Sequence, residues 1–253
     1  MTSDERHQNE INNYWSSRAK EFSYARRLDL QDEQHDIWIK ILKDHLPEKK
    51  NIKALDLGTG AGFFAFLLDE LGIETYGIDY SQNMIDEAIL NQQELHHEKI
   101  HFVRMDAMNL EFEDDMFDFI ITRNVTWTLP DPKKAYQEMV RVLKENGRIL
   151  NFDANYGKQF ETMSDESIHK SYESQFDSKY HKVLQSEEQM KERNRLATSL
   201  YIAKRERPSW DVDVLLSLGM KYVSVDLKNT ELLDGHQREK IHTSGMFKLF
   251  AIK

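Results

Sequence analysis

The first half of the chain contains an aspartate followed by a turn rich in glycine. Asp56 stands two residues before Gly58, and Gly60 and Gly62 follow at two-residue spacing, directly after the apolar segment 52–57. Because glycine has no Cβ, such a turn can bend sharply and let a ligand lie against backbone N–H groups at the start of a helix, where polar or anionic oxygen atoms are favoured. The segment predicts a nucleotide-binding β-α-β unit; a turn without a ligand is the alternative.

Two further aspartates follow apolar segments in the same way. Asp79 comes directly after segment 75–78, where a carboxylate can accept hydrogen bonds from both hydroxyls of a ribose. Asp106 follows segment 100–104, and it either faces the same ligand or caps the next turn. Ligands of open parallel sheets bind at the carboxyl ends of strands, so we expect the three carboxylates to converge around an adenosine-type ligand.

The elements that must position these residues are visible as hydrophobic patterns. Segment 117–122 is nearly all apolar, which is typical of a central parallel strand. Ser81 is a plausible N-cap, and Pro132 suits the first turn of a helix. We predict strands at residues 52–57, 75–78, 100–104, 117–122, 148–152, 221–226 and 246–252, and N-terminal helices at 9–25 and 32–46.

The glycine spacing separates two kinds of nucleotide-binding protein. A dinucleotide fingerprint is G-x-G-x-x-G, whereas this chain has G-x-G-x-G with Phe63 at the position of the third glycine. Asp56 would be unfavourable beside a pyrophosphate but suits a cationic sulfonium or ammonium group. The segment 56–62 resembles the D-x-G-x-G-x-G loop of class I S-adenosylmethionine-dependent methyltransferases of the small-molecule type (methyltransferase domain 11, UbiE-like).

This resemblance implies a fold and a division of the chain. The fold is a Rossmann-like, doubly wound, seven-stranded α/β sheet, mostly parallel with an antiparallel edge hairpin. Residues 1–46 would form a helical lid, 47–154 the cofactor-binding core, 155–207 a helical substrate-binding insertion after strand five, and 208–253 the last helix and edge strands.

The resemblance also implies S-adenosylmethionine as the cofactor and assigns residues to it. Tyr14, Trp15 and Arg18 belong to an N-terminal helix that folds over the cofactor, or else simply packs on the domain. Tyr80 and Met84 would lie near the adenine, although Met84 is equally well explained as core. The full set of predicted cofactor-binding residues is Tyr14, Trp15, Arg18, Asp56, Gly58, Thr59, Gly60, Gly62, Phe63, Asp79, Tyr80, Met84, Asp106, Ala107, Asn124 and Val125.

The acceptor side is less determined by the sequence. Trp127, Tyr156 and His181 are the predicted substrate-binding residues, with Trp127 as a wall of the methyl-transfer chamber. No general base is needed for an acceptor that is already a thiolate, an amine or an enolate. If one is needed, the candidates are His181, Tyr156 and Asp153, each of which is equally well explained as structural.

Composition narrows the class of partner. The net charge of −10 argues against a partner held mainly through phosphates, and the absence of cysteine excludes disulfides and thiolate metal sites. Neighbouring His96 and His97 do not have metal-ligand spacing, so no metal is expected. We expect a cytoplasmic monomer or homodimer that acts on a small molecule and binds neither nucleic acid nor a membrane.

Two other functions are compatible with parts of the pattern. A nicotinamide-dependent reductase is disfavoured by the glycine spacing and by the lack of a Y-x-x-x-K pair. A regulatory domain that binds S-adenosylmethionine without catalysis would keep the same three aspartates. The leading hypothesis is methyl transfer to a small-molecule acceptor by direct displacement in a pocket that excludes water.

Overall fold

The computed structural model describes residues 3–173, 185–228 and 246–253. Within them, seven strands form one sheet in the order β3-β2-β1-β4-β5-β7-β6. The strands β1 to β5 are parallel, and β7 is antiparallel to both β5 and β6. The strand bounds are β1 Lys53–Leu57, β2 Glu74–Asp79, β3 Ile100–Arg104, β4 Phe117–Arg123, β5 Leu143–Ala154, β6 Tyr222–Asp226 and β7 Met246–Ile252. The predicted fold class, including its antiparallel edge hairpin, is confirmed.

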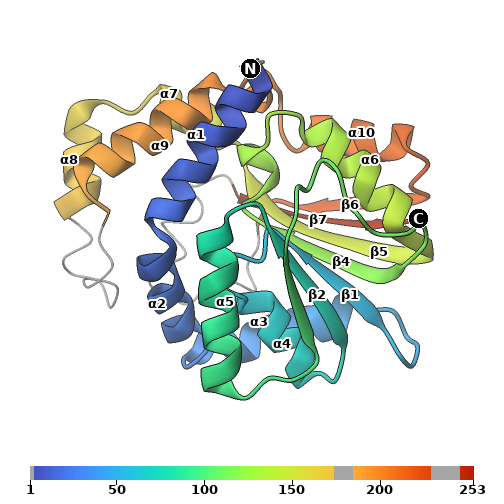
Figure 1. Ribbon diagram of the computed structural model, residues 1–253. Helices are drawn as coiled ribbons and strands as arrows, with labels where there is room; N and C mark the ends of the chain where they lie inside the picture. The colour runs from blue at the N-terminus through green and yellow to red at the C-terminus, as the bar shows by residue number, and fades with distance from the viewer. Residues whose placement is uncertain (1–2, 174–184, 229–245) are drawn as a thin grey trace.

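Helices cover both faces of this sheet and one of its ends (Figure 1). Those packed against the sheet are α3 Glu33–His45, α4 Phe63–Glu70, α5 Gln82–Leu95, α6 Pro132–Val142 and α10 Ser209–Ser217. Those gathered at the end are α1 Ser3–Ser17, α2 Ala19–Asp29, α7 Tyr156–Glu161, α8 Asp165–Glu173 and α9 Glu187–Ser199. Among the described residues, none of the helices is long and apolar enough to cross a membrane.

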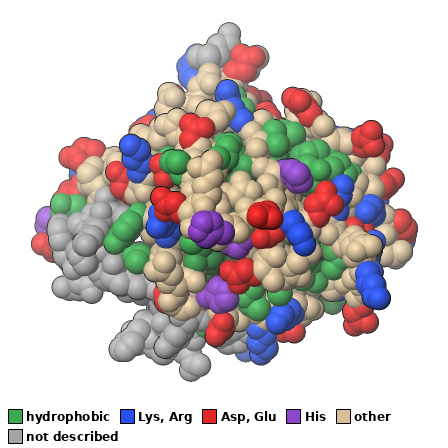
Figure 2. Space-filling view, turned by 60° about the horizontal axis from the view of Figure 1, so that its bottom comes forward, with side chains coloured by type: hydrophobic (Ala, Val, Ile, Leu, Met, Phe, Trp, Pro, Cys, Tyr) green, Lys and Arg blue, Asp and Glu red, His purple; other side chains and the backbone are tan. Residues whose placement is uncertain are grey.

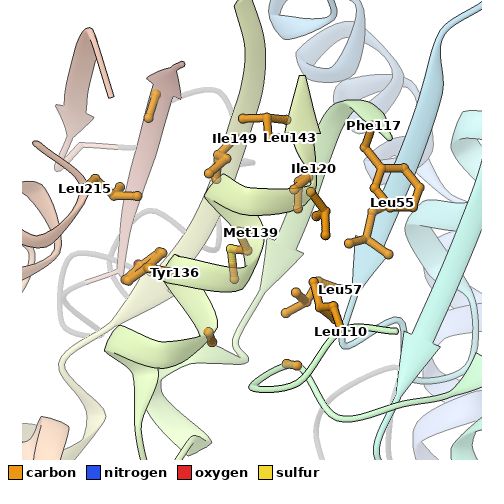
Figure 3. Packing of buried hydrophobic residues seen from close by; sticks show 14 of the residues in the cluster. Leu55, Leu57, Leu110, Phe117, Ile120, Tyr136, Met139, Leu143, Ile149 and Leu215 are labelled. Carbon is orange, nitrogen blue, oxygen red and sulfur yellow. The ribbon is translucent and has the colours of Figure 1, made fainter. Parts of the chain in front are cut away.

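The two largest core clusters lie on opposite faces of the sheet. On one face, Ile120 and Ile149 pack against Met139 of α6, as Figure 3 shows. On the other face, Trp38 of α3 makes edge contacts with the ring of Phe64 in α4, with centroids 4.9 Å apart. Each large apolar side chain buried in this way stabilises the fold by about 1.5–3 kcal/mol. The parallel strands are therefore fixed from both faces, and their carboxyl ends meet at one edge.

Several element boundaries differ from the sequence prediction. In place of one helix over 9–25 there are two, Ser3–Ser17 and Ala19–Asp29, because the backbone leaves helical geometry at Arg18, with φ −111° and ψ 3°. The last sheet strand before the insertion, β5, begins at Leu143 rather than 148, because Leu143 pairs with Phe117 of β4 and the Asn146 N–H donates to the Lys253 carbonyl beyond the end of β7. Asn146 has φ 61°, the left-handed geometry expected for this turn.

Candidate functional site

A cavity of about 280 Å³ lies at the carboxyl ends of the parallel strands. Its walls come from the ends of β1, β2 and β4, the loop after β3, and helices α1 and α2. The predicted cofactor-binding residues that line it are Trp15, Asp56, Gly58, Thr59, Gly60, Phe63, Asp79, Tyr80, Met84, Asp106, Ala107, Asn124 and Val125. The three aspartates therefore do converge on one cavity.

Three predicted residues lie outside this lining. Gly62 is the N-cap of α4 with φ 95°, and a Cβ there would stand 2.7 Å from the Phe66 ring, so its role is close packing. Tyr14 and Arg18 are buried, at 7% and 9% exposure, but belong to a neighbouring cluster against α9. Because these three residues do not line the cavity, its geometry does not support their predicted contact with the cofactor.

Asp79 ties the glycine turn to the end of β2. Its Oδ2 accepts a hydrogen bond from the Gly60 N–H at 3.0 Å, and its Oδ1 accepts one from the Ser81 N–H at 2.9 Å. Burial raises the pKa of Asp79 to about 6, although the backbone donors act in the opposite direction. The carboxylate is thus fixed in orientation while it still lines the cavity.

Asp56 is the most buried of the three carboxylates, at 2% exposure. Its Oδ2 accepts hydrogen bonds from the Thr59 hydroxyl at 2.6 Å and from the Ala65 N–H at 3.1 Å. Burial raises the pKa of Asp56 to about 7, and the nearby charge of Asp79 contributes in the same direction. A carboxylate with these properties is stabilised by a cation in the cavity.

Asp106 caps the turn after β3, which is one of the two roles that the sequence left open, and it also lines the cavity. Its Oδ1 accepts from the Met108 N–H at 2.8 Å, which caps the turn after β3, and its Oδ2 accepts from the Gln8 side-chain amide of α1 at 2.8 Å. Ser16 of α1 also bonds the Ser81 hydroxyl across the cavity edge at 2.7 Å. These contacts hold α1 over the strand ends.

The N-terminal helices supply lining residues that sequence reasoning missed. These are Gln8, Ile11, Asn12, Phe22 and Arg26, and the strand ends, the loops after them and α4 add Phe64, Ile78, Ser81, Met105, Arg123, Thr128, Leu129 and Pro130. Asn12, Ile11 and Gln8 lie three, four and seven residues before Trp15, so they share its side of α1. Extending the helical pattern back from Trp15 to residue 8 would have found these three residues.

The loop after β4 contacts both the cavity and the aromatic side chains of Trp127 and Tyr156. Asn124 has φ 57°, a left-handed geometry that asparagine tolerates, and its Oδ1 accepts from the Tyr156 hydroxyl at 3.0 Å. The rings of Tyr156 and Trp127 lie 4.9 Å apart. Burial raises the pKa of Tyr156 to about 12, so this phenol is a proton donor at neutral pH rather than a base. His181 lies outside the described residues.

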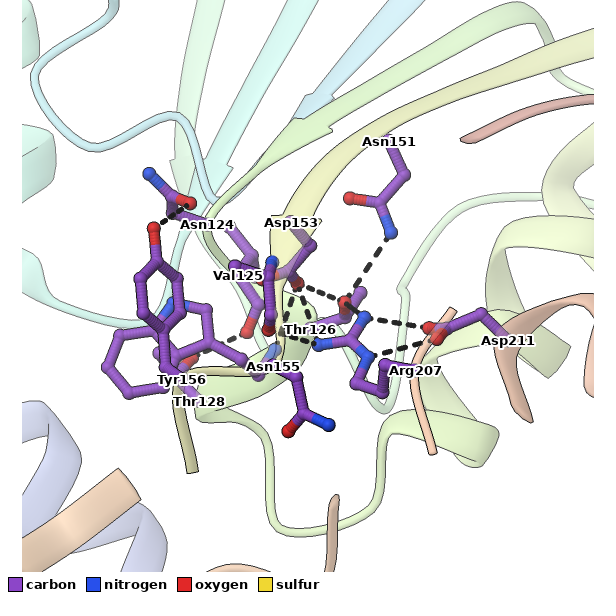
Figure 4. Close-up of polar contacts among 12 residues, drawn as sticks. Asn124, Val125, Thr126, Thr128, Asn151, Asp153, Asn155, Tyr156, Arg207 and Asp211 are labelled. Atoms are coloured by element: carbon purple, nitrogen blue, oxygen red, sulfur yellow. Dashed lines mark hydrogen bonds and ion pairs between the residues drawn. The ribbon is translucent and has the colours of Figure 1, made fainter. Parts of the chain in front are cut away.

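Asp153 is held by structural partners instead of facing the cavity (Figure 4). One of its oxygens accepts from the Thr126 hydroxyl and from the Trp127 N–H at 3.0 Å, and Arg207 forms an ion pair with it at 3.3 Å. Burial raises the pKa of Asp153, and the charge of Arg207 opposes this shift. We therefore do not retain Asp153 as a candidate base; its partners hold the loop that carries Asn124.

The same buried network extends to α10 and α6. Arg207 donates to both oxygens of Asp211, at 2.9 and 2.7 Å, and the Tyr136 hydroxyl donates to Asp211 at 2.8 Å. Although burial opposes the charge of Arg207, Asp153 and Asp211 hold its pKa above its usual value. The network connects the last helix to the end of β5.

The described residues contain no group of three or more histidine, aspartate or glutamate side chains placed to hold a metal ion. His97 is engaged elsewhere, since its Nδ1 lies 2.7 Å from Asp69 and its ring stacks on Phe66. The polar groups of the cavity are carboxylates, amides, hydroxyls and the guanidinium groups of Arg26 and Arg123, a mixture that suits an organic ligand.

The fold and site together define a Rossmann-like α/β protein that binds a ligand at the carboxyl ends of its strands. Residues 48–204, more than half of the chain, match a protein family described as a methyltransferase domain, and the chain belongs to this family. The predicted family is therefore confirmed.

Curated relatives agree with this assignment over part of their length. The chain is 32% identical over 133 residues to phosphoethanolamine N-methyltransferase 2 of Caenorhabditis elegans, covering 52% of this chain and 30% of the relative. It is 36% identical over 121 residues to a demethylmenaquinone methyltransferase of Staphylococcus haemolyticus, covering 47% and 50%. In each case the match covers half or less of the relative.

Solved structures share the fold. A methyltransferase from Aquifex aeolicus that depends on S-adenosylmethionine matches with a TM-score of 0.56 and 20% identity, over 94% of this chain and 97% of that one. Phosphoethanolamine N-methyltransferase 2 of Haemonchus contortus, solved with phosphomonomethylethanolamine and S-adenosylhomocysteine, matches with a TM-score of 0.57 and 17% identity, over 85% and 51%.

Replacing Asp211 by asparagine is expected to lower the free energy of unfolding by about 3–5 kcal/mol, because it leaves the buried Arg207 with one carboxylate partner fewer. Urea denaturation monitored by circular dichroism measures the change. Glu145→Gln is the control: its ion pair with Lys221 is exposed, so it should cost less than about 1 kcal/mol. Equal effects of the two substitutions would contradict the structural role of the network.

Proposed function

We propose that this chain transfers a methyl group from S-adenosylmethionine to a small-molecule acceptor. The observation that supports this most strongly is the convergence of Asp56, Asp79 and Asp106 on one cavity at the strand ends. A buried carboxylate with a raised pKa, Asp56, fits the cationic part of this cofactor. A fixed carboxylate beside the glycine turn, Asp79, fits its two ribose hydroxyls.

When bound, S-adenosylmethionine supplies an electrophilic methyl group, so the protein needs to position the acceptor and exclude water. In our proposal Asp106, Ala107 and Met84 bind the adenine, and Asn124 and Val125 line the methionine side. Trp15 of α1 lies in the wall of the cavity and excludes water from it. Positioning of this kind can contribute on the order of 7–11 kcal/mol to catalysis.

The proposal of a small acceptor rests on the relatives and on surface charge. The two curated relatives are named for phosphoethanolamine and demethylmenaquinone, which are both small molecules. On the face drawn in Figure 2, acidic and basic side chains of the described residues are interspersed, without a broad basic patch. A cytoplasmic location and a monomeric or homodimeric state belong to the same proposal and rest on the sequence.

We also propose which segments of the chain bind the cofactor and which bind the acceptor. Helices α1 and α2 act as the cofactor lid, since they contribute Gln8, Trp15 and Phe22 to the cavity wall. The helices between residues 155 and 207 form the acceptor side, because Tyr156 reaches Asn124 from there. The relatives are named as methyltransferases. They therefore support neither a nicotinamide-dependent reductase nor a sensor, that is, a regulatory domain that binds S-adenosylmethionine without catalysis.

Incubation of the purified protein with methyl-labelled S-adenosylmethionine and a panel of small metabolites tests the reaction. We expect label to appear in at least one metabolite with release of S-adenosylhomocysteine. Tight binding without transfer to any acceptor would favour the sensor, and binding of a nicotinamide nucleotide in place of S-adenosylmethionine would favour the reductase.

Replacing Asp79 by asparagine should weaken S-adenosylmethionine binding by about 1–3 kcal/mol, the scale of hydrogen bonds to a charged group. Isothermal titration calorimetry measures the dissociation constant. Asp86→Asn is the matched control, because Asp86 is exposed on α5 and bonds only Gln82 among the described residues. An unchanged constant for the Asp79 variant would show that the ribose does not bind there.

Binding of S-adenosylmethionine should strengthen as pH rises from 5.5 to 8.5. The pKa values of Asp79 and Asp56 are raised to about 6 and about 7, and the proposed contacts need both carboxylates ionised. We expect at least about a tenfold gain in affinity, since one pKa unit corresponds to 1.36 kcal/mol. S-adenosylhomocysteine, which lacks the sulfonium charge, should show a smaller change, and equal affinities at the two pH values would contradict the assignment of Asp56.

A further inference from the structure

Two buried or half-buried arginines beside the cavity form no ion pair with any described carboxylate. Arg18, at the break between α1 and α2, is 9% exposed and has no side-chain hydrogen bond within the described part of the chain. Arg193 of α9 is half-buried, and its guanidinium contacts the amide oxygens of Gln185 and Asn194. By contrast Arg207, buried to the same extent as Arg18, has two carboxylate partners.

Tyr14 links the two guanidinium groups, because that of Arg18 lies 6.0 Å from the centre of the Tyr14 ring and the Tyr14 hydroxyl accepts from the same Gln185 amide that Arg193 contacts. Burial lowers the pKa of Arg193, the positive charge of Arg18 lowers it further, and the hydroxyls of Tyr14 and Tyr156 act in the opposite direction. The charge of Arg193 is costly to hold partly away from water without an opposite charge, and a like charge nearby adds to that cost. An anion bound between the two guanidinium groups would remove both penalties.

The surroundings of Arg193 resemble a prepared oxyanion site. Its guanidinium lies 4.4 Å from the centre of the Phe160 ring, which fixes its plane. Its Nη1 donates to the Gln185 oxygen at 3.1 Å, and the same amide donates to the Tyr14 hydroxyl at 2.9 Å. A neutral amide oxygen thus occupies the position that a carboxylate or phosphate oxygen would take with greater stabilisation.

This cluster adjoins the proposed methyl-transfer chamber. Arg193 and Tyr14 line a small void together with Trp127, and Trp15 and Thr128 belong both to that void and to the 280 Å³ cavity. A molecule anchored at Arg193 would therefore extend past Trp15 and Trp127 toward Asn124. Its anionic end and its reacting atom would lie at opposite ends of this path.

We propose that Arg18 and Arg193 bind the anionic oxygen group of the methyl acceptor, a carboxylate or a phosphate monoester, and so select acidic small molecules. The inference rests on the proposed function, because it assigns the acceptor end of the same site. The anion displaces the Gln185 amide oxygen from Arg193, and the aromatic rings of Trp127 and Tyr156 flank the rest of the acceptor.

The test is calorimetric titration of the unmodified protein, saturated with S-adenosylhomocysteine, with two matched pairs of probes. Phenyl phosphate is compared with phenol, and benzoate with benzyl alcohol. We expect at least one anion to bind ten times or more tightly than its neutral partner, and the pair that shows the difference identifies phosphate or carboxylate. Equal or undetectable binding of both anions relative to the neutral probes would overturn the proposal.

Variants then locate the anion. Arg193→Gln and Arg18→Gln should each weaken the preferred anion at least tenfold, whereas Arg193→Lys should retain part of the affinity. Lys191→Gln is the control, because Lys191 is on the same helix but 49% exposed, and it should change binding less than twofold. Unchanged affinity in both glutamine variants would overturn the proposal; if either variant fails to fold, the probe pairs on the unmodified protein decide.

The same experiment separates this inference from the proposed function. Binding of S-adenosylhomocysteine without a preference for anions leaves the methyltransferase assignment intact and rejects the role of the two arginines. If S-adenosylhomocysteine does not bind, the assignment of the cofactor fails, and titration of the probes into the protein alone still tests the arginines.

Discussion

Two carboxylates held close together at the ends of β1 and β2 are the constraint on which the site depends. Burial raises the pKa of both Asp56 and Asp79, so the neutral forms are favoured on folding. Their contribution to stability is fully present below the unfolded pKa of 3.8 and is lost as pH rises through about 6 to 7. At neutral pH the folded protein without a ligand therefore lacks this contribution to its stability, because both carboxylates are ionised while buried. A ligand with a positive charge or hydrogen-bond donors stabilises the ionised carboxylates.

The rest of the chain maintains this arrangement. The Gly60 and Ser81 N–H groups orient Asp79, and α1 is fastened over the cavity through its contacts with Asp106 and Ser81. On the far side, the buried ion pairs of Arg207 hold the loop after β4 in the geometry that presents Asn124. The loops around the ligand are therefore positioned by polar contacts with partners distant in sequence.

The sequence predicted most of the fold and the strand-end half of the site, because these features follow from local patterns. Apolar segments, the glycine turn and the three aspartates at the ends of β1, β2 and β3 are all visible within a few residues. The break at Arg18 has no glycine or proline to mark it, and the early start of β5 depends on pairing with Lys253. Whether Asp153 is structural or catalytic is decided by Arg207, more than fifty residues later in the chain.

The central claim is that an adenosyl ligand binds across the ends of β1 and β2, and a crystal structure with S-adenosylhomocysteine tests it most directly. We predict both ribose hydroxyls within about 3 Å of the Asp79 carboxylate, the sulfur atom on the side of Asn124, and the Gly60 turn against the ligand. An adenosine bound elsewhere, or side chains that keep this cavity closed to the ligand, would contradict the account.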